Sequence, residues 1–459
     1  MNSSIFRAYD IRGIIGAALT SEIAREIGRA IGSQAHDQGQ KTLVVGRDGR
    51  LSGSDLRKAL VAGILATGAN VIDIGQVPTP VLYFAANRLG TGSGVMVTGS
   101  HNPPEYNGFK IMLGGRTLFG DAITHLHTRI EHRRFVSGKG KTQRRDIVPE
   151  YIRRVSRDIP KASENRFTIA VDCGNGVAGG IAPQLFRALG HDVLEMHCEI
   201  DGHFPNHHPD PSQPENLRDL INTVLDNQAD FGLAFDGDGD RLGVVDNKGS
   251  IIWPDRQLML FSRDILSRHP GAGIVFDTKC SRHLAQEIER RGGCPVMWKT
   301  GHSFIKEKMR ETGALLAGEM SGHIFFKERW YGFDDALYAA ARLIEILITA
   351  QAPPDRIFAS LPEAISTPEL RVDMPEARSL IFMERLAERF PRIFSDACIT
   401  TIDGLRADYP DGWGLVRASN TTPSLVLRFE ADHESALHRI EERFRDALLR
   451  VDPELPLPF

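Results

Sequence analysis

The feature that most limits how this chain can fold is a pattern of strands and glycine-bounded turns that occurs three times. In each copy an apolar strand leads into a polar loop and a helix, a second strand follows a glycine, and a third strand ends in a loop rich in reactive side chains. The expected strands are residues 42–45, 71–74 and 94–97, then 168–171, 192–195 and 231–235, then 274–276, 295–298 and 314–317. Strands that alternate with helices predict three mixed or parallel α/β sheets in tandem.

The last part of the chain, from about Thr367, follows another pattern. Leu425, Leu427 and Phe429 alternate as in a half-buried strand, and a terminal amphipathic helix carries an apolar stripe further on. With 459 residues the chain is too long for one core. We therefore predict three related mixed α/β domains and a C-terminal α+β domain around a central cleft, with boundaries at 1–146, 147–249, 250–366 and 367–459.

The loop that follows the third strand of the first copy contains the candidate nucleophile. Ser100 comes just after residues 94–97, at the carboxyl end of a strand, where open α/β sheets usually bind ligands. His101 follows directly, and Lys110 brings a cation back toward the same place. A rigid hydroxyl among cations can accept and return a phosphoryl group, although Ser-His-Asn alone is also typical of an ordinary turn.

The equivalent loop of the second copy carries Asp236, Asp238 and Asp240, with glycines between them. Three carboxylates aimed at one point favour a hard divalent cation, and Mg²⁺ fits because it keeps open positions for phosphate oxygens. An EF-hand is excluded, because Arg241 and Asn247 occupy the sixth and twelfth positions, where that loop needs Gly and Glu. Arg241 is suited to a phosphate oxygen or to developing charge.

The loops of the third and fourth domains offer hydrogen-bonding groups. Glu319, Ser321 and His323 share one tight turn, where a carboxylate could accept from two neighbouring sugar hydroxyls. In the fourth domain a guanidinium, hydroxyls and backbone N–H groups in one run could hold a phosphate dianion without a metal. These residues are Arg417, Ser419, Asn420 and Thr421.

Several other residues are weaker candidates. Tyr9 and Arg12 precede the first core element, which suggests a segment laid over a site, and Lys279 and His302 are possible cations of the same cleft. The histidines at 203, 207 and 208 have a spacing that matches no standard zinc site, so no metal is expected among them.

Composition excludes some classes of function. The chain is 41% hydrophobic and 25% charged, and its net charge of -4 is spread without blocks, which argues against nucleic acid and membrane surfaces as partners. Five cysteines without metal spacing suggest reduced thiols. The sequence starts without an apolar signal region and holds no long uncharged apolar run, so we expect a cytoplasmic protein.

Four motifs, in order and in successive domains, together resemble the α-D-phosphohexomutase superfamily, and within it the bacterial branch that acts on mannose and glucose phosphates. The motifs are residues 98–104 (TGSHNPP), 236–241 (DGDGDR), 318–323 (GEMSGH) and 417–423 (RASNTTP). The resemblance covers essentially the whole chain, and none of the four loops departs from the family pattern.

The resemblance implies a role for each candidate residue. Ser100 would be the phosphoserine and would hold Mg²⁺ together with Asp236, Asp238 and Asp240. The catalytic candidates are Ser100, His101, Lys110, Arg12 and His302, with Lys110 and His302 favoured for proton transfer. The substrate-binding candidates are Tyr9, Lys279, Glu319, Ser321, His323, Arg417, Ser419, Asn420 and Thr421, and Arg241 would stabilise phosphate charge.

The implied reaction interconverts hexose 1-phosphate and hexose 6-phosphate, with a hexose 1,6-bisphosphate as intermediate and activator and small phosphosugars as the partners. A carboxylate at Glu319 that holds the ring hydroxyls O3 and O4 would leave C2 unread, which predicts activity on both mannose and glucose. Met320 resembles this branch, whereas the glucosamine enzymes tend to carry Gln there, so phosphoglucosamine mutase stays as the alternative. A phosphatase and a non-catalytic phosphosugar-binding protein are further alternatives. A monomer is expected, in which a loosely tied fourth domain swings.

Overall fold

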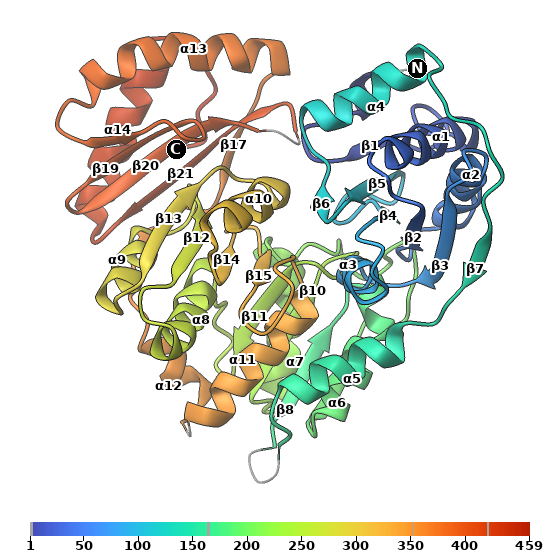
Figure 1. Ribbon diagram of the computed structural model, residues 1–459. Helices are drawn as coiled ribbons and strands as arrows, with labels where there is room; N and C mark the ends of the chain where they lie inside the picture. Colours follow the sequence, from blue (N-terminus) through green and yellow to red (C-terminus); the bar gives the residue numbers. More distant parts are fainter. Residues whose placement is uncertain (1–2, 163–165, 351, 420–421) are drawn as a thin grey trace.

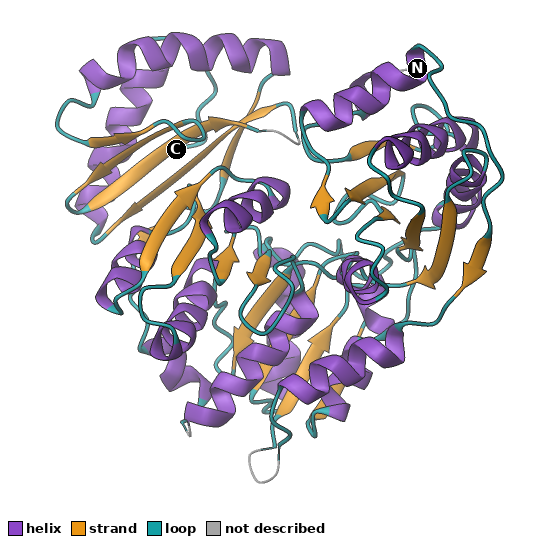
Figure 2. Cartoon of the chain, in the orientation of Figure 1, coloured by secondary structure: helices purple, strands orange, loops and turns teal. Residues whose placement is uncertain are grey.

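The computed structural model describes residues 3–162, 166–350, 352–419 and 422–459. These residues form four sheet-based units that follow one another in an arc, with the first and the fourth unit at its two ends (Figure 1). Connecting loops gather where the units meet (Figure 2).

The first three units share one strand order, which confirms the threefold repeat. In each unit the first strand lies between the second and the third, parallel to both, and a fourth strand pairs antiparallel with the third. In the first unit these are β2 (Thr42–Arg47), β3 (Asn70–Gln76), β4 (Gly94–Val97) and β5 (Tyr106–Leu113). In the second they are β8 (Thr168–Asp172), β9 (Asp192–Met196), β10 (Phe231–Phe235) and β11 (Leu242–Asp246), and in the third β12 (Gly273–Asp277), β13 (Cys294–Trp298), β14 (Leu316–Gly318) and β15 (Ile324–Phe326).

Because each unit has a fourth strand, the predicted reactive loops lie between two strands and not after the last strand of the sheet. Strands β4 and β10 coincide with the predicted ranges, whereas β14 begins two residues later than expected. The reactive loops are therefore hairpin connections between the third and the fourth strand. Lys110 lies within β5 rather than in a loop.

Helices accompany these sheets, and the first sheet gains three more strands. In the first unit the additions are β1 (Ile11–Ile14), β6 (Arg116–Thr117), β7 (Thr142–Arg144), α1 (Ser21–Asp37), α2 (Gly53–Leu65), α3 (Thr79–Arg88) and α4 (Asp121–Glu131). The second unit has α5 (Val148–Asp158), α6 (Ala182–Ala188) and α7 (Arg218–Asp226), and the third has α8 (Pro254–Arg268), α9 (Arg282–Arg290), α10 (His302–Thr312), α11 (Ala336–Ala350) and α12 (Pro354–Ala359). No helix in these described ranges is both long and apolar enough to cross a membrane.

One hydrophobic core runs through the first three units. A single cluster of buried side chains includes Val44 of the first sheet, Val171 of the second and Phe276 of the third. Between them, Phe84 of α3 stacks on Trp330 with ring centroids 6.0 Å apart. The fourth unit has a separate core of its own.

The fourth unit is an antiparallel sheet with helices on one face. Its strands are β16 (Ile365–Ser366), β17 (Leu370–Asp373), β18 (Cys398–Thr400), β19 (Leu405–Tyr409), β20 (Gly412–Ala418) and β21 (Ser424–Ala431), and its helices are α13 (Glu376–Ile393) and α14 (Glu434–Leu449). Leu425, Leu427 and Phe429 pack in its core as predicted, but β21 is buried on both faces and not half-buried. Its second face meets the third unit: Glu430 accepts a hydrogen bond from Ser281 Oγ at 2.9 Å.

Polar contacts tie the fourth unit to the third. The buried guanidinium of Arg406 donates to the carbonyl oxygens of Thr278 and Cys280 at 2.7 and 3.0 Å. Arg428 donates to the carbonyl oxygen of Lys279. The expectation that the fourth domain has few ties to the others is therefore wrong, because charged side chains on the sheet face reach backbone carbonyls across the boundary.

Candidate active site

Ser100 lies in the β4–β5 connection and has a left-handed backbone, with φ of 50°. Such a conformation is rare outside glycine and persists only where the surroundings hold it. Here the N–H of Ser100 donates to Thr98 Oγ1 at 2.8 Å, and the N–H of Gly99 donates to Asp48 Oδ2 at 3.1 Å. The serine is almost fully buried. The loop is thus held rigidly around the hydroxyl.

Arg50 supports this loop by hydrogen bonds to its backbone. Its guanidinium is fully buried, pairs with Asp48, and donates to four carbonyl oxygens of the loop, those of Ser100, Asn102, Pro103 and Tyr106. A Cβ on Gly99 would lie 2.4 Å from this guanidinium, so only glycine fits there. Arg50 therefore holds the loop mainly through the loop's own backbone.

The three aspartates of the β10–β11 connection meet Ser100 directly. Ser100 Oγ donates to Asp236 Oδ2 at 2.9 Å, and Asp236, Asp238 and Asp240 are all fully buried. The backbones are equally close, since a Cβ on Gly237 would lie 2.5 Å from the carbonyl oxygen of Ser100. The first and second domains therefore form one compact centre.

Lys110 reaches this centre from β5. Its ammonium contacts Asp238 Oδ2 at 2.8 Å and also pairs with Asp240. Burial alone would lower the pKa of Lys110, but the two carboxylates raise it well above its usual value. These contacts suit Lys110 to neutralise charge at this centre, and the proton transfer expected of it stays a prediction.

The carboxylate cluster fits a hard cation. One oxygen from each of Asp236, Asp238 and Asp240 lies within 4.8 Å of the others, and the Oδ1 atoms of Asp238 and Asp240 are buried without a hydrogen-bond partner. Burial and the two neighbouring carboxylates raise the pKa of Asp236 well above its usual value. These donors suit Mg²⁺, which prefers carboxylate oxygens and keeps positions open for phosphate.

Two side chains flank the Ser100 hydroxyl. His101 Nδ1 lies 3.2 Å from Ser100 Oγ, and burial together with Arg241 and Arg12 lowers the pKa of His101 well below its usual value. The ring is therefore neutral at pH 7. Arg12 of β1 lies beside the loop, where its guanidinium contacts Asn102 and Asp10.

A second group of titratable side chains adjoins the aspartates, and its central member was missed from the sequence. Asp334 is fully buried and pairs with Lys306 at 2.9 Å, with His323 Nδ1 at 3.3 Å and with His302 Nδ1 at 3.6 Å. Burial and Lys306 lower the pKa of His302 well below its usual value, so this ring is neutral too. Asp334 thus lies within 3.6 Å of both histidines, yet it belongs to none of the four motifs.

The β14–β15 connection joins the second domain through Arg241. Arg241 Nε donates to His323 Nε2 at 3.1 Å. Glu319 is buried and accepts the N–H of Gly301 at 2.5 Å, while burial raises the pKa of Glu319 to about 7. Ser321 is half-buried in the same turn.

Tyr9 connects the first domain to the third. Its hydroxyl donates to the carbonyl oxygen of Thr300 at 2.8 Å, and its ring packs edge-on against Phe304 and His302. The N-terminal segment therefore lies against the start of α10, next to His302. This placement agrees with the expectation of a segment laid over a site.

The loop of the fourth domain reaches the others indirectly. Arg417 Nε donates to Asp403 Oδ2 at 2.9 Å, and the same oxygen accepts the N–H of Thr300 at 3.0 Å. Lys279 pairs with Glu369 at 2.9 Å, which crosses the same boundary.

Ser419 is half-buried, and its hydroxyl bonds to Thr422. The other two residues of the predicted phosphate clamp, Asn420 and Thr421, lie outside the described residues. Within the described part of this loop, no hydrogen bond or ion pair joins it directly to the loop of Ser100.

Family models cover nearly the whole chain. The models describe phosphoglucomutase/phosphomannomutase, with α/β/α domain I matching residues 3–137, domain II residues 149–249, domain III residues 253–365 and the C-terminal domain residues 369–447. The chain belongs to the phosphoglucomutase/phosphomannomutase family. The resemblance drawn from the four motifs is thereby confirmed.

Individual members of the phosphoglucomutase/phosphomannomutase family align along their full length. The chain is 58% identical to a phosphomannomutase/phosphoglucomutase of Pseudomonas aeruginosa over 457 residues, which are 100% of this chain and 98% of that protein. It is 53% identical to a phosphoglucomutase of Neisseria gonorrhoeae, with 99% and 98% covered. A crystal structure of a family member from Burkholderia thailandensis superposes with a TM-score of 0.94 at 52% identity, covering 100% of both chains.

Proposed function

We propose that this protein interconverts the 1-phosphates and 6-phosphates of mannose and glucose through a phosphorylated Ser100 and a hexose 1,6-bisphosphate. The observation that carries the proposal is the contact of 2.9 Å between Ser100 Oγ and Asp236 within a buried cluster of three carboxylates. This contact places a hydroxyl that can carry phosphate beside donors that can hold a divalent cation. Identities of 58% to a phosphomannomutase/phosphoglucomutase and 53% to a phosphoglucomutase, each over the full length, support the same reaction.

In the first half-reaction, a hydroxyl oxygen of the bound sugar phosphate attacks the phosphorus on Ser100. The new P–O bond forms to the sugar while the bond to Ser100 Oγ breaks, and the product is the bisphosphate. The neutral ring of His302 is the candidate to accept the proton of the sugar hydroxyl. The serine oxygen regains a proton, for which His101, with Nδ1 at 3.2 Å, is the candidate relay.

The second half-reaction reverses these bonds after the bisphosphate has turned end for end. Ser100 Oγ then attacks the other phosphate, and the sugar leaves with a single phosphate at its new position. Throughout, Lys110 and Arg241 offset negative charge at the phosphoryl group. The loop of Arg417 and Ser419, with Asn420 and Thr421, is assigned to the phosphate that does not react.

Asp236, Asp238 and Asp240, with a phosphate oxygen on Ser100, are the residues assigned to Mg²⁺. When bound, the ion would supply Lewis-acid stabilisation of the phosphoryl oxygens.

Substrate choice is assigned to the turn of the third domain. The carboxylate of Glu319 would accept from two adjacent ring hydroxyls common to mannose and glucose, with Ser321 beside it. No residue in this assignment contacts C2, where the two sugars differ. Met320 packs against the apolar core and its N–H donates to Asp277.

The roles divide among four segments, each carrying one loop. Residues 1–146 supply the phosphoserine, 147–249 the metal ligands, 250–366 the sugar contacts and 367–459 the phosphate clamp. Because one chain supplies every assigned residue, we propose a monomer that acts on free phosphosugars in the cytoplasm.

A coupled assay with mannose, glucose and glucosamine 1-phosphates tests the proposal. Turnover of mannose and glucose phosphates is expected, with a requirement for Mg²⁺ and a trace of hexose 1,6-bisphosphate to prime unphosphorylated protein. Ser100→Ala should abolish turnover and leave the fold unchanged by circular dichroism. Full turnover by this variant would refute the proposal, preference for glucosamine phosphate would move the substrate to the alternative, and release of free phosphate at the isomerisation rate would indicate a phosphatase.

A further inference from the structure

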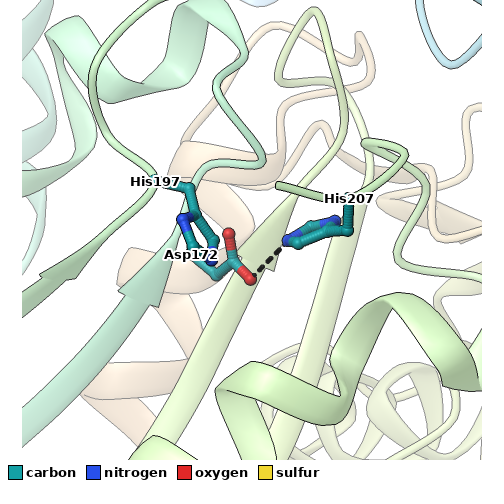
Figure 3. A group of neighbouring side chains, drawn as sticks. All are labelled: Asp172, His197 and His207. Atoms are coloured by element: carbon teal, nitrogen blue, oxygen red, sulfur yellow. Dashed lines mark hydrogen bonds and ion pairs between the residues drawn. The ribbon is translucent and has the colours of Figure 1, made fainter. Parts of the chain in front are cut away.

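A cluster in the second domain, outside the site described above, combines two imidazoles with a carboxylate. Asp172 ends β8, His197 directly follows β9, and His207 lies in the next loop. Figure 3 shows the three side chains turned toward one another. One donor atom from each lies within 4.8 Å of the other two. His207 shows no standard zinc spacing in the sequence, because the fold groups it with residues at the ends of the two preceding strands.

Two of the donors are already held by their neighbours. Asp172 Oδ1 accepts the N–H of Gly174 at 2.8 Å, so Oδ2 is the oxygen that faces the histidines. His207 Nδ1 lies 3.0 Å from the carbonyl oxygen of His208, and this contact aims Nε2 at Asp172 Oδ2, 2.8 Å away. Metal-binding histidines are commonly oriented in this way, with the second nitrogen donating to a carbonyl.

The third donor lacks a hydrogen-bond partner. His197 Nε2 is buried without a hydrogen bond, and its ring stands at 78° to that of His207 with centroids 5.3 Å apart. The nearest carboxylate oxygen to this nitrogen, Asp219 Oδ2 in the first turn of α7, is 3.6 Å away. In a tetrahedral zinc site with bonds of 2.0–2.1 Å, donors are roughly 3.3 Å apart. Small side-chain rotations would therefore bring the three clustered donors around one ion, with Asp219 next to His197 as the candidate for the fourth position.

We propose that Asp172, His197 and His207, with Asp219 as the fourth ligand, form a Zn²⁺ site. Two imidazole nitrogens and two carboxylates suit zinc, whereas the catalytic cluster offers only carboxylate oxygens and suits Mg²⁺. The two sites thus differ in the metal that they select.

The site has a structural role, because its ligands enclose the segment between β9 and α7. This segment supports the active-site loops: the ring of Phe204 lies 5.2 Å from the guanidinium of Arg50, and the carbonyl oxygen of Pro209 accepts the N–H of Gly237 at 3.3 Å. A zinc ion would fasten the segment to the ends of β8 and β9. Bound zinc is therefore expected to raise the thermal stability of the protein.

Cobalt titration of the unmodified full-length protein in excess Mg²⁺ tests the proposal, because four-coordinate Co²⁺ with nitrogen ligands absorbs strongly in the visible range. One equivalent of Co²⁺ with such bands is expected, displaced by Zn²⁺. His197→Phe should weaken binding at least about 10-fold. His203→Phe is the matched control, because His203 belongs to the same segment but is exposed and pairs with Asp201 instead. It should bind Co²⁺ like the wild type.

Three outcomes would overturn the proposal: no binding by the wild type in excess Mg²⁺, equal binding by His197→Phe, or thiolate-to-cobalt charge-transfer bands. The last would assign the metal to Cys173 and Cys198, whose sulfurs are 3.5 Å apart. If His197→Phe does not fold, His197→Gln makes the same comparison. Zinc-edge anomalous diffraction from wild-type crystals must also place the ion at Asp172, His197 and His207.

Discussion

Replacing Lys110 by methionine should strengthen Mg²⁺ binding and at the same time suppress activity. The ammonium lies against Asp238 and Asp240, two of the assigned metal ligands. It neutralises them in the free protein but repels a bound cation. Methionine keeps the length and apolar stem of the side chain and removes only this charge.

The size of the effect follows from the geometry. For a divalent charge about 4–5 Å from an ammonium, the repulsion is about 7 kcal/mol at an effective dielectric constant of about 20. Relaxation and water entry would leave about 1.5–3 kcal/mol, which is about 10- to 100-fold in Kd. Asp238 stays in place without Lys110, because Thr79 and Thr98 also donate to its Oδ2, at 2.6 and 3.0 Å.

Isothermal titration of metal-free, unphosphorylated protein at fixed ionic strength measures this difference. Lys306→Met is the control, because Lys306 is also buried in the site but pairs with Asp334. Its Mg²⁺ affinity should change by no more than about threefold, since charges without direct contact to the ligands couple weakly. Equal or weaker Mg²⁺ binding by Lys110→Met would refute the reasoning, because the ammonium would then assist the ion rather than oppose it.

Three further predictions concern other parts of the molecule. Gly237→Ala places a Cβ 2.5 Å from the Ser100 carbonyl oxygen and should lower kcat about 100-fold, whereas Gly180→Ala, with 3.5 Å to its nearest neighbour, should be neutral in the same assay. His191 is held neutral, because its Nδ1 accepts the N–H of Phe167 and burial lowers its pKa to about 4. The free energy of unfolding should therefore fall by about 1–3 kcal/mol as the pH falls from 6.5 to 4, since the unfolded chain binds this proton more readily. Urea unfolding of His191→Asn should lack this loss. Arg406→Met should speed hydrogen exchange at the boundary between the third and fourth domains, and unchanged exchange there would contradict the role given to its two carbonyl contacts.

The strand pattern and the reactive loops could be predicted because both are local properties of the sequence. Apolar runs such as residues 94–97 and 231–235 end in loops whose composition is unusual, and three copies reinforce one another. The antiparallel fourth strand of each unit was not predicted. In the first unit this strand contains Lys110 and directly follows a turn of polar residues, so it reads as part of the loop.

Residues that act through tertiary contacts could not be found in this way. Asp334 comes after the Glu319 turn, and an antiparallel bridge to Phe325 returns it to the site. No spacing in the sequence therefore indicates its contact with two histidines. Arg428 and Glu430 alternate with apolar residues and resemble a solvent-facing strand face. Only the docked third domain makes them interior.

The shared core of the first three domains bears on how the chain could be divided into fragments. A cut at either boundary within that core would expose packed aromatic and aliphatic side chains on both pieces, including Phe84 and Trp330. Separating the C-terminal segment would instead uncover mostly ionic and hydrogen-bonding groups, which water can solvate. Expression of residues 367–459 alone should yield a folded, soluble piece, whereas the isolated second domain should aggregate.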